Sequence, residues 1–188
     1  MNKIIIITAP SGSGKTTIVK QLLQRSAHLG FSISACTRNP RPGEIHGKDY
    51  YFLEETDFKQ KIEENAFIEW EMVYTGKYYG TLKSEINRIW EDNKAPLVDI
   101  DVLGALNIKS QYEEKSISFF IKAPSVEELR NRLVARGTET PQTLQERLDK
   151  AEYELSFADR FDCIIVNDNL ERAIEETLVI IEDFLGKE

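Results

Sequence analysis

The chain has 188 residues, the length of one ordinary domain, and 41% of them are apolar while 30% are charged. This composition excludes an intrinsically disordered chain and gives no apolar run long enough to span a membrane. The formal net charge of −8 argues against binding nucleic acid through a basic face, so anionic ligands must be held by local cations. With 2 cysteines and no targeting segment, we expect a cytoplasmic protein with neither nucleic acid nor membrane as a partner.

The N-terminal segment combines a strand, a glycine-rich loop and a helix. Residues 3–8 contain four consecutive isoleucines, which put apolar β-branched side chains on both faces, as is typical of a strand inside a parallel sheet. Residues 9–16 read Ala-Pro-Ser-Gly-Ser-Gly-Lys-Thr, and residues 16–26 carry apolar side chains at helical spacing. This order is the context that a phosphate-binding loop requires. The alternative, a surface turn that binds nothing, does not account for the flanking strand and helix.

In a phosphate loop, backbone N–H groups surround the phosphate oxygens, and the following helix adds its positive N-terminal end. Lys15 would reach the β- and γ-phosphates of ATP, and the Thr16 hydroxyl would bind Mg²⁺. Ala9 stands where glycine is common, and a small side chain serves there if no positive φ is needed. The predicted ATP-binding residues of this segment are Ser11, Gly12, Ser13, Gly14, Lys15, Thr16 and Thr17. GTPases, motors and small-molecule kinases share such a loop, so it does not identify the reaction.

The next segment, residues 34–93, breaks the alternation of strands and helices. It is rich in Tyr, Gly, Pro and charged residues. Its strand candidates at residues 50–53 and 67–72 alternate between apolar and polar side chains, as in a small half-exposed antiparallel sheet. Insertions on a rigid sheet are where substrates usually bind, so we expect a binding site here.

Later apolar segments return to the first pattern. Strands are predicted at residues 96–100, 117–122 and 163–166, with helices between them, which indicates an α/β fold with a parallel core sheet flanked by helices. Residues 137–144 are predicted to link two helices, and Asp168 is expected to cap the last helix.

Motifs distributed along the chain resemble the guanylate kinase family, in the order in which that family has them. They are Ser34-Ala35-Cys36-Thr37-Arg38-Asn39-Pro40-Arg41-Pro42-Gly43-Glu44, Gly47-Lys48-Asp49-Tyr50, Phe67-Ile68-Glu69-Trp70, Tyr78-Tyr79-Gly80-Thr81, Asp99-Ile100-Asp101, Arg136-Gly137-Thr138-Glu139-Thr140 and Val166-Asn167-Asp168. Together they cover essentially the whole chain and are far more specific than the phosphate loop.

The resemblance implies a phosphate-loop nucleoside monophosphate kinase fold in a single domain. Its core would comprise residues 1–33, 94–136 and 158–188, with a mixed, β-rich GMP-binding insertion at residues 34–93 and a helical lid at residues 137–157. The implied reaction is the Mg²⁺-dependent transfer of the γ-phosphoryl group of ATP to GMP, with dGMP as a further acceptor.

The resemblance also assigns the residues that bind GMP. The phosphate would be held by Arg38, Arg41, Tyr50 and Tyr79, and guanidinium forks and phenols suit a dianion. Guanine would be read by Ser34, Glu69, Thr81 and Asp101, with Asp99 close by. Carboxylates only accept hydrogen bonds and the guanine edge donates them, so AMP should be a poor acceptor. The alternative is that these are solvated loop and sheet-surface residues.

The expected catalytic residues are Lys15, Arg38, Asp99, Arg132, Arg136 and Arg147. In the family pattern the last three belong to a lid that neutralises charge on the transferring phosphoryl group, and Asp99 lies near Mg²⁺. Asn167 would lie beside the adenine of ATP. Without the resemblance, Arg132 and its neighbours would be interpreted as a solvated helix face paired with nearby glutamates.

Three other functions remain open at this stage. A catalytically dead domain that binds phosphorylated proteins would be expected to have an eroded phosphate loop, whereas Gly14, Lys15 and Thr16 are intact. A kinase for a ribose bisphosphate would not need Glu69 and Asp101 together. A regulatory GTPase would carry an Asn-Lys-x-Asp motif, which the sequence lacks.

Overall fold

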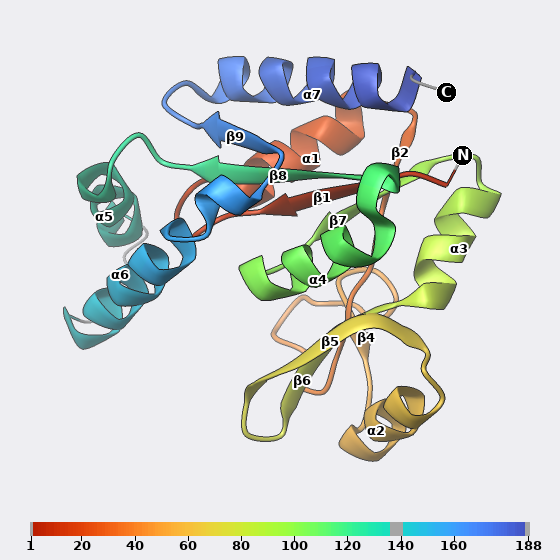
Figure 1. The fold of residues 1–188 in the computed structure, drawn as a ribbon. Coiled ribbons are helices and arrows are strands. Elements are labelled where there is room, and N and C mark those ends of the chain that lie inside the picture. The colour runs from red at the N-terminus through yellow and green to blue at the C-terminus, as the bar shows by residue number, and fades with distance from the viewer. Residues whose placement is uncertain (1, 136–140, 187–188) are drawn as a thin grey trace.

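The computed structural model describes residues 2–135 and 141–186, and its larger sheet has five parallel strands (Figure 1). Their order across the sheet is β2-β7-β1-β8-β9. The strands are β1 (Ile4–Thr8), β2 (Leu29–Phe31), β7 (Ala95–Asp99), β8 (Ser116–Lys122) and β9 (Cys163–Val166). This sheet, with helices on both faces, confirms the predicted α/β class. Strand β2 was not predicted, because three residues are too few to show a pattern.

The isoleucines of β1 explain why the sheet is covered on both faces. Ile5 and Ile7 pack with residues of α1 (Lys15–Arg25) and α7 (Leu170–Gly186). Ile4 and Ile6 point the other way and pack with α3 (Lys83–Glu91) and α4 (Val102–Tyr112). All four are fully buried, and each contributes about 1.5–3 kcal/mol relative to exposure. The strand therefore places the phosphate loop at the edge of a well-packed core.

The smaller sheet is formed by residues of the segment 34–93, which was predicted as an insertion. Its order is β4-β3-β6-β5; β3 pairs with β4 in parallel and the other pairs are antiparallel, so the sheet is mixed. The strands are β3 (Ala35–Cys36), β4 (Tyr51–Phe52), β5 (Phe67–Tyr74) and β6 (Lys77–Leu82). Helix α2 (Glu55–Glu63) covers it, and the ring of Phe58 stacks on Phe67 at 4.4 Å between centroids. This sheet thus has a small core of its own.

Helices α5 (Val126–Ala135) and α6 (Pro141–Leu155) pack on each other through Leu129, Leu133 and Ala151. Helix α6 begins within the segment 137–144 that was predicted as a link, because proline suits the first position of a helix. Short 3₁₀ helices cover Glu113–Lys115 and Ala158–Arg160. The predicted lid residue Arg136 lies outside the described residues.

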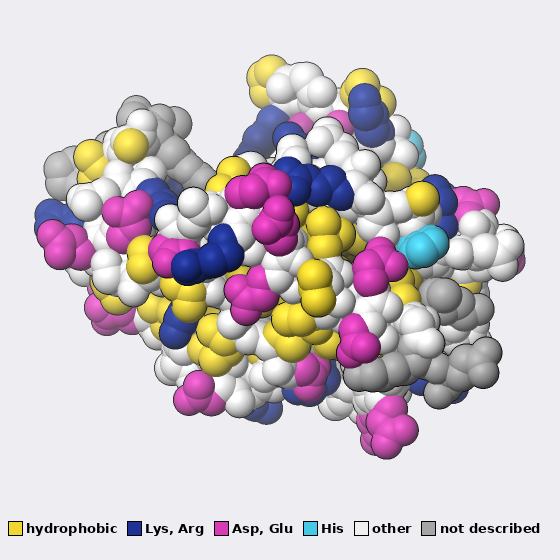
Figure 2. All heavy atoms as spheres, turned by 90° about the horizontal axis from the view of Figure 1, so that it is seen from above, with side chains coloured by type: hydrophobic (Ala, Val, Ile, Leu, Met, Phe, Trp, Pro, Cys, Tyr) yellow, Lys and Arg dark blue, Asp and Glu magenta, His cyan; other side chains and the backbone are white. Residues whose placement is uncertain are grey.

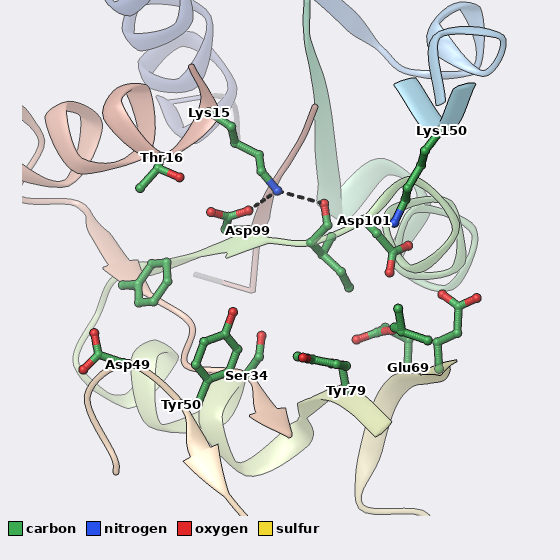
Figure 3. A pocket seen from close by; sticks show the side chains of 15 residues that line it. Lys15, Thr16, Ser34, Asp49, Tyr50, Glu69, Tyr79, Asp99, Asp101 and Lys150 are labelled. Carbon is green, nitrogen blue, oxygen red and sulfur yellow. Dashed lines mark hydrogen bonds and ion pairs between the residues drawn. The ribbon is translucent and has the colours of Figure 1, made fainter. Parts of the chain in front are cut away.

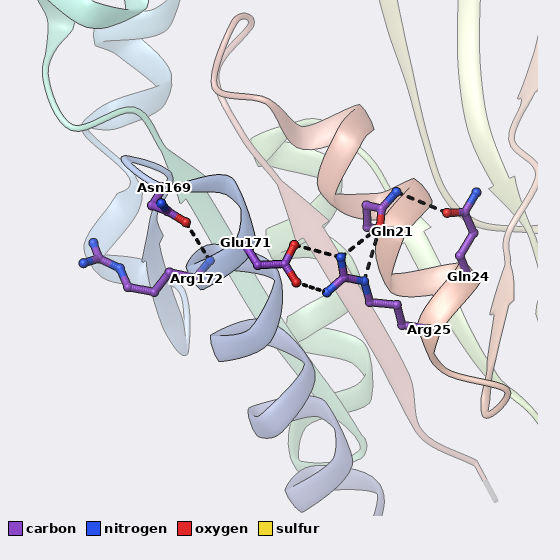
Figure 4. A network of polar contacts seen from close by, with 6 residues as sticks. All are labelled: Gln21, Gln24, Arg25, Asn169, Glu171 and Arg172. Carbon is purple, nitrogen blue, oxygen red and sulfur yellow. Dashed lines mark hydrogen bonds and ion pairs between the residues drawn. The ribbon is translucent and has the colours of Figure 1, made fainter.

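The cap of α7 lies one residue later than predicted (Figure 4). Asn169 Oδ1 accepts a hydrogen bond from the backbone N–H of Arg172 at 3.0 Å, and α7 begins at Leu170. The prediction of Asp168 as the cap was therefore wrong, since its carboxylate instead pairs with the Arg172 guanidinium. Asp and Asn cap helices equally well, so propensity could not choose between these two neighbours.

Figure 2 shows acidic and basic side chains interspersed over the face that includes α7. Among the described residues, no helix is both long enough and apolar enough to cross a membrane.

Candidate nucleotide-binding site

The phosphate loop has the backbone conformation that its sequence predicts. Gly12 and Gly14 have φ values of 95° and 93°, and the N–H of Ser13 donates to the carbonyl of Pro10 at 3.1 Å. A Cβ at Gly14 would lie 2.3 Å from Asn167 Nδ2, so glycine is required there both for conformation and for space. Ala9 is not among the residues with positive φ, so alanine is unstrained at this position.

Asn167 and Arg132 support this loop from outside. The buried amide of Asn167 donates from Nδ2 to the Ser13 carbonyl at 2.8 Å. Arg132 donates to the Asn167 carbonyl at 2.9 Å and to Glu128 Oε1 at 2.8 Å. The structure therefore uses both side chains to hold the loop and its neighbours. Neither is among the residues that line the two cavities described below.

A cavity of about 420 Å³ opens between the two sheets, at the carboxyl ends of the parallel strands (Figure 3). This is where open parallel sheets place their ligands. Eight of the predicted site residues line it: Lys15, Thr16, Ser34, Tyr50, Glu69, Tyr79, Asp99 and Asp101. The fold therefore brings the phosphate loop, the end of β7 and the smaller sheet to one space.

Lys15 is held at the end of β7, on the floor of this cavity. Its Nζ forms an ion pair with Asp99 and also donates to the carbonyl of Ile100 at 3.4 Å. Figure 3 shows Lys15 reaching from α1 toward Asp99, with Thr16 beside them. A phosphate chain entering here would meet a cation that is already oriented by the sheet.

A buried acid, Glu69, lines the cavity, and the buried hydroxyl of Thr81 belongs to its partner residue on the neighbouring strand β6. Glu69 Oε1 and Thr81 Oγ1 have no hydrogen-bond partner among the described residues, although both atoms are shielded from solvent. Burial raises the pKa of Glu69 to about 7; Thr81, which lies close enough to stabilise the carboxylate by weak hydrogen bonding, opposes this shift, and the Asp101 carboxylate adds to it. Unpaired buried polar atoms are costly, so these two point to a polar ligand.

Helix α4 fixes the position of the two acids Asp101 and Glu69. Asp101 caps the helix, because its Oδ1 accepts the N–H of Gly104 at 2.9 Å. A Cβ at Gly104 would lie 2.9 Å from Glu69 Oε2 and 2.5 Å from the Ile100 side chain. Glycine at this position therefore lets the helix approach Glu69 closely.

The two arginines predicted to hold a phosphate, Arg38 and Arg41, do not line the cavity. Both η nitrogens of Arg38 bind the Glu44 carboxylate, at 2.6 and 2.7 Å, which lowers the pKa of Glu44 to about 2 through the Arg38 and Arg41 hydrogen bonds. The Arg38 guanidinium lies 4.8 Å from the ring centroid of Tyr50. The Arg41 N–H also donates to Glu44, while its side chain is exposed.

A second cavity of about 300 Å³ adjoins the first along the phosphate loop. Lys15 and Asp101 line both spaces, which therefore meet at these residues. Of the predicted lid arginines, Arg147 lines the second cavity. Four more of the predicted ATP-binding residues line the second cavity, namely Ser11, Gly12, Gly14 and Thr16. Ser13 and Thr17, which were also predicted to bind ATP, do not line it.

Four charged residues that the sequence did not predict as site residues line the two cavities: Asp49, Glu71, Lys150 and Glu154. Glu71 lies two residues after Glu69 on β5 and lines the first cavity; burial and the Asp101 carboxylate raise its pKa. Lys150 reaches from α6 toward Asp101 (Figure 3) and lines both cavities. Its Nζ also forms an ion pair with Glu154, at 4.0 Å from Oε1. The period of two on a strand could have identified Glu71, and the spacing from Arg147 on a helix could have identified Lys150.

The residues present fit a magnesium ion bound mainly by phosphates. Among the described residues, no group of three or more His, Cys, Asp or Glu side chains is arranged to hold a metal. The Thr16 hydroxyl and the Asp99 carboxylate nevertheless line one cavity. Mg²⁺ prefers such oxygen ligands, and it is commonly held by one or two of them together with substrate phosphates.

Known proteins resemble this chain along its whole length. A family model described as guanylate kinase matches residues 1–184. The guanylate kinase of Bacteroides thetaiotaomicron is 50% identical, over 99% of this chain and 91% of that protein. The guanylate kinase of Porphyromonas gingivalis is 48% identical over 100% of both. A crystal structure of guanylate kinase from Anaplasma phagocytophilum has a TM-score of 0.79 at 29% identity, and the match covers 98% of this chain and 87% of that one. The chain belongs to the guanylate kinase family.

Proposed function

We propose that this protein transfers the γ-phosphoryl group of ATP to GMP and releases ADP and GDP. The observation that supports this most directly is the cavity itself, which joins the phosphate loop to a buried carboxyl with an unpaired oxygen. The two free cysteines suit the reducing cytoplasm, where we place this activity.

The smaller sheet forms the acceptor site in this proposal. Residues 34–93 make the GMP-binding insertion, residues 137–157 make the lid, and the remainder is the core. Glu69 and Thr81 supply the buried oxygens that meet the guanine edge, and Asp101, whose Oδ1 caps α4, offers its other carboxylate oxygen. Ser34 completes the base site.

Tyr50 and Tyr79 present their hydroxyls to the phosphate of GMP, and Arg38 and Arg41 neutralise it. The Arg38 fork is bound to Glu44, so phosphate binding requires Arg38 to share or release that carboxylate. The proposed contacts involve only the base and the phosphate. Because none of them reaches a ribose hydroxyl, we propose dGMP as a second acceptor.

The phosphate loop holds the donor through its backbone N–H groups, with Lys15 on the β- and γ-phosphates. Mg²⁺ held by Thr16, with Asp99 nearby, would neutralise charge on the phosphates. As ATP binds, Lys15 exchanges its contact with Asp99 for phosphate oxygens. Arg132, Arg136 and Arg147 are assigned to the lid, and Asn167 to the adenine end of the site.

The transfer itself needs no covalent enzyme intermediate. A phosphate oxygen of GMP attacks the γ-phosphorus in line as the bond to ADP breaks, and catalysis consists of alignment and charge stabilisation. Closure of the insertion and the lid excludes water, which would otherwise hydrolyse ATP.

A coupled assay of ADP release tests the acceptor. With ATP and Mg²⁺, GMP and dGMP should support turnover, whereas AMP, CMP and UMP should not. Buried carboxylates facing the unprotonated N1 of adenine stay unpaired, which can discriminate by about 10⁴-fold in kcat/KM. Equal turnover with AMP and GMP would refute the guanine assignment.

The use of GMP should also depend on pH. Only the ionised Glu69 offers both carboxylate oxygens as acceptors to the guanine N–H groups, and its pKa is about 7 in the free protein. The KM for GMP should therefore rise as pH falls below about 7, by up to about tenfold per unit, while the KM for ATP does not follow it. The second ionisation of a phosphate monoester has a pKa of about 6, so the effect of Glu69 is measured between pH 8 and about 6.5.

The same shift has the opposite consequence for the free protein. Because the folded pKa of Glu69, about 7, exceeds the ordinary value of 4.5, the folded state binds more protons between these pH values. The Glu69 contribution to the free energy of unfolding should therefore decrease as pH rises through this window.

A KM for GMP that stayed flat from pH 8 to about pH 6.5 would argue that Glu69 does not contact the base.

A further inference from the structure

One buried carboxylate outside the cavity is not used by the proposed reaction. Glu85 lies in the first turn of α3, and its side chain is only 2% exposed. It is not among the residues that line the nucleotide cavity. A buried charge is costly unless it is paired and fully hydrogen-bonded, so its partners indicate what holds it there.

Four donors satisfy this carboxylate completely. Oε1 accepts the backbone N–H of Ile33 at 3.1 Å and Arg88 Nη2 at 2.7 Å. Oε2 accepts the Tyr51 hydroxyl at 2.9 Å and Arg88 Nε at 3.0 Å. Burial alone would raise the pKa of Glu85, but the hydrogen bonds from Arg88, Ile33 and Tyr51 outweigh it and lower the pKa. The group is therefore ionised throughout the neutral range.

Two of these partners are the chain neighbours of acceptor-site residues. Ile33 precedes Ser34, and Tyr51 follows Tyr50; both Ser34 and Tyr50 line the cavity (Figure 3). Successive side chains of a strand point to opposite faces, so Tyr51 can reach Glu85 while Tyr50 faces the cavity. The N–H of Tyr51 also donates to the Ser34 carbonyl at 2.9 Å, which couples the two segments directly.

Glu85 also lies where the chain crosses between the two sheets. Ile33 follows β2 of the larger sheet and leads into β3 of the smaller one. Helix α3, which carries Glu85, leads back from β6 to β7 and contacts both strands. The Glu85 carboxylate therefore connects the segment that leaves the larger sheet with the helix that leads back to it.

We propose that Glu85 is a positioning residue of the acceptor site, which holds Ser34 and Tyr50 in register through Ile33 and Tyr51. This inference rests on the proposed function and extends it to a residue that touches no substrate. Without Glu85, the two strands that present Ser34 and Tyr50 would lose their shared anchor, while the phosphate loop on the other side of the cavity would keep its contacts.

Two substitutions test this role. Glu85→Gln keeps the shape but replaces one acceptor oxygen by a donor group, so in either orientation of the amide Arg88 loses one acceptor, together with either Ile33 or Tyr51. Tyr51→Phe removes one hydrogen bond and keeps the ring in its apolar packing, so it should fold even if Glu85→Gln does not. Glu91→Gln, an exposed position on the same helix, is the matched control.

We expect Glu85→Gln to raise the KM for GMP about tenfold, and Tyr51→Phe to raise it severalfold, with the KM for ATP within about twofold of wild type. The double variant should be little worse than Glu85→Gln alone, because both changes break the same contact. Glu91→Gln should behave as wild type.

The failures of the two proposals are distinguishable. If the wild type uses GMP but Tyr51→Phe and Glu85→Gln lower only the unfolding midpoint and leave the KM for GMP unchanged, the positioning role is wrong and the proposed function stands. Equal increases in the KM values for GMP and ATP would overturn the role as well. If the wild type does not use GMP, both proposals fall together.

Discussion

Replacing Lys15 with alanine is expected to lower kcat for phosphoryl transfer by about 10³-fold or more. Lys15 lies where the two cavities meet, so its ammonium group is available to the phosphates between donor and acceptor. The substitution also removes the ion-pair partner of Asp99 and leaves that carboxylate facing the negative phosphates. ADP release at saturating ATP and GMP measures the loss, and single-turnover kinetics assign it to the chemical step.

The matched control for this experiment is Lys20→Ala, an exposed lysine on the same helix. It should retain wild-type kcat and KM values. Unfolding midpoints for both variants separate a catalytic defect from a folding defect. Normal turnover in Lys15→Ala would remove the phosphate loop from the mechanism and return the dead, phosphoprotein-binding domain to consideration.

The larger sheet could be predicted from the sequence because its signals are local. Four consecutive isoleucines followed by a glycine-rich loop specify a doubly buried strand and its turn within one segment. Strand β2 was not predicted, because its three residues pair with β7, which lies far away in the chain. The cap of α7 was missed for a different reason: Asp168 and Asn169 are equally suited as caps by residue type, and the structure uses Asn169.

The site was only partly predictable, because its geometry depends on long-range packing. Glu69 was identified through the family motif, but its unpaired oxygen and raised pKa follow from the approach of α4 at Gly104. The bond between Arg38 and Glu44 joins two residues of a single motif, yet the motif does not show that Arg38 is already occupied. Glu85 gave no sequence signal, because its partners belong to three separate segments.

Glu69→Gln is expected to reduce kcat/KM for GMP by about 10²- to 10³-fold and to leave the KM for ATP unchanged. Glu69 is 7% exposed, so a lost bond to the base cannot be replaced by water. The carboxamide that replaces the carboxylate presents an NH₂ group to a guanine edge that also donates, so one buried donor stays unpaired. Initial rates at varied GMP and fixed ATP measure this loss, and the pH dependence of GMP use should disappear with it.

The selectivity of this variant separates base recognition from a general defect. Glu63→Gln, an exposed glutamate on α2 of the same insertion, should keep wild-type constants for both nucleotides. In Glu69→Gln the new NH₂ group can donate to the unprotonated N1 of adenine. The preference for GMP over AMP should therefore fall, because kcat/KM decreases for GMP and increases for AMP. A distorted insertion would weaken both acceptors together and keep their ratio. An unchanged ratio would therefore assign the fall in rate to a general defect of the insertion and would contradict base recognition by Glu69.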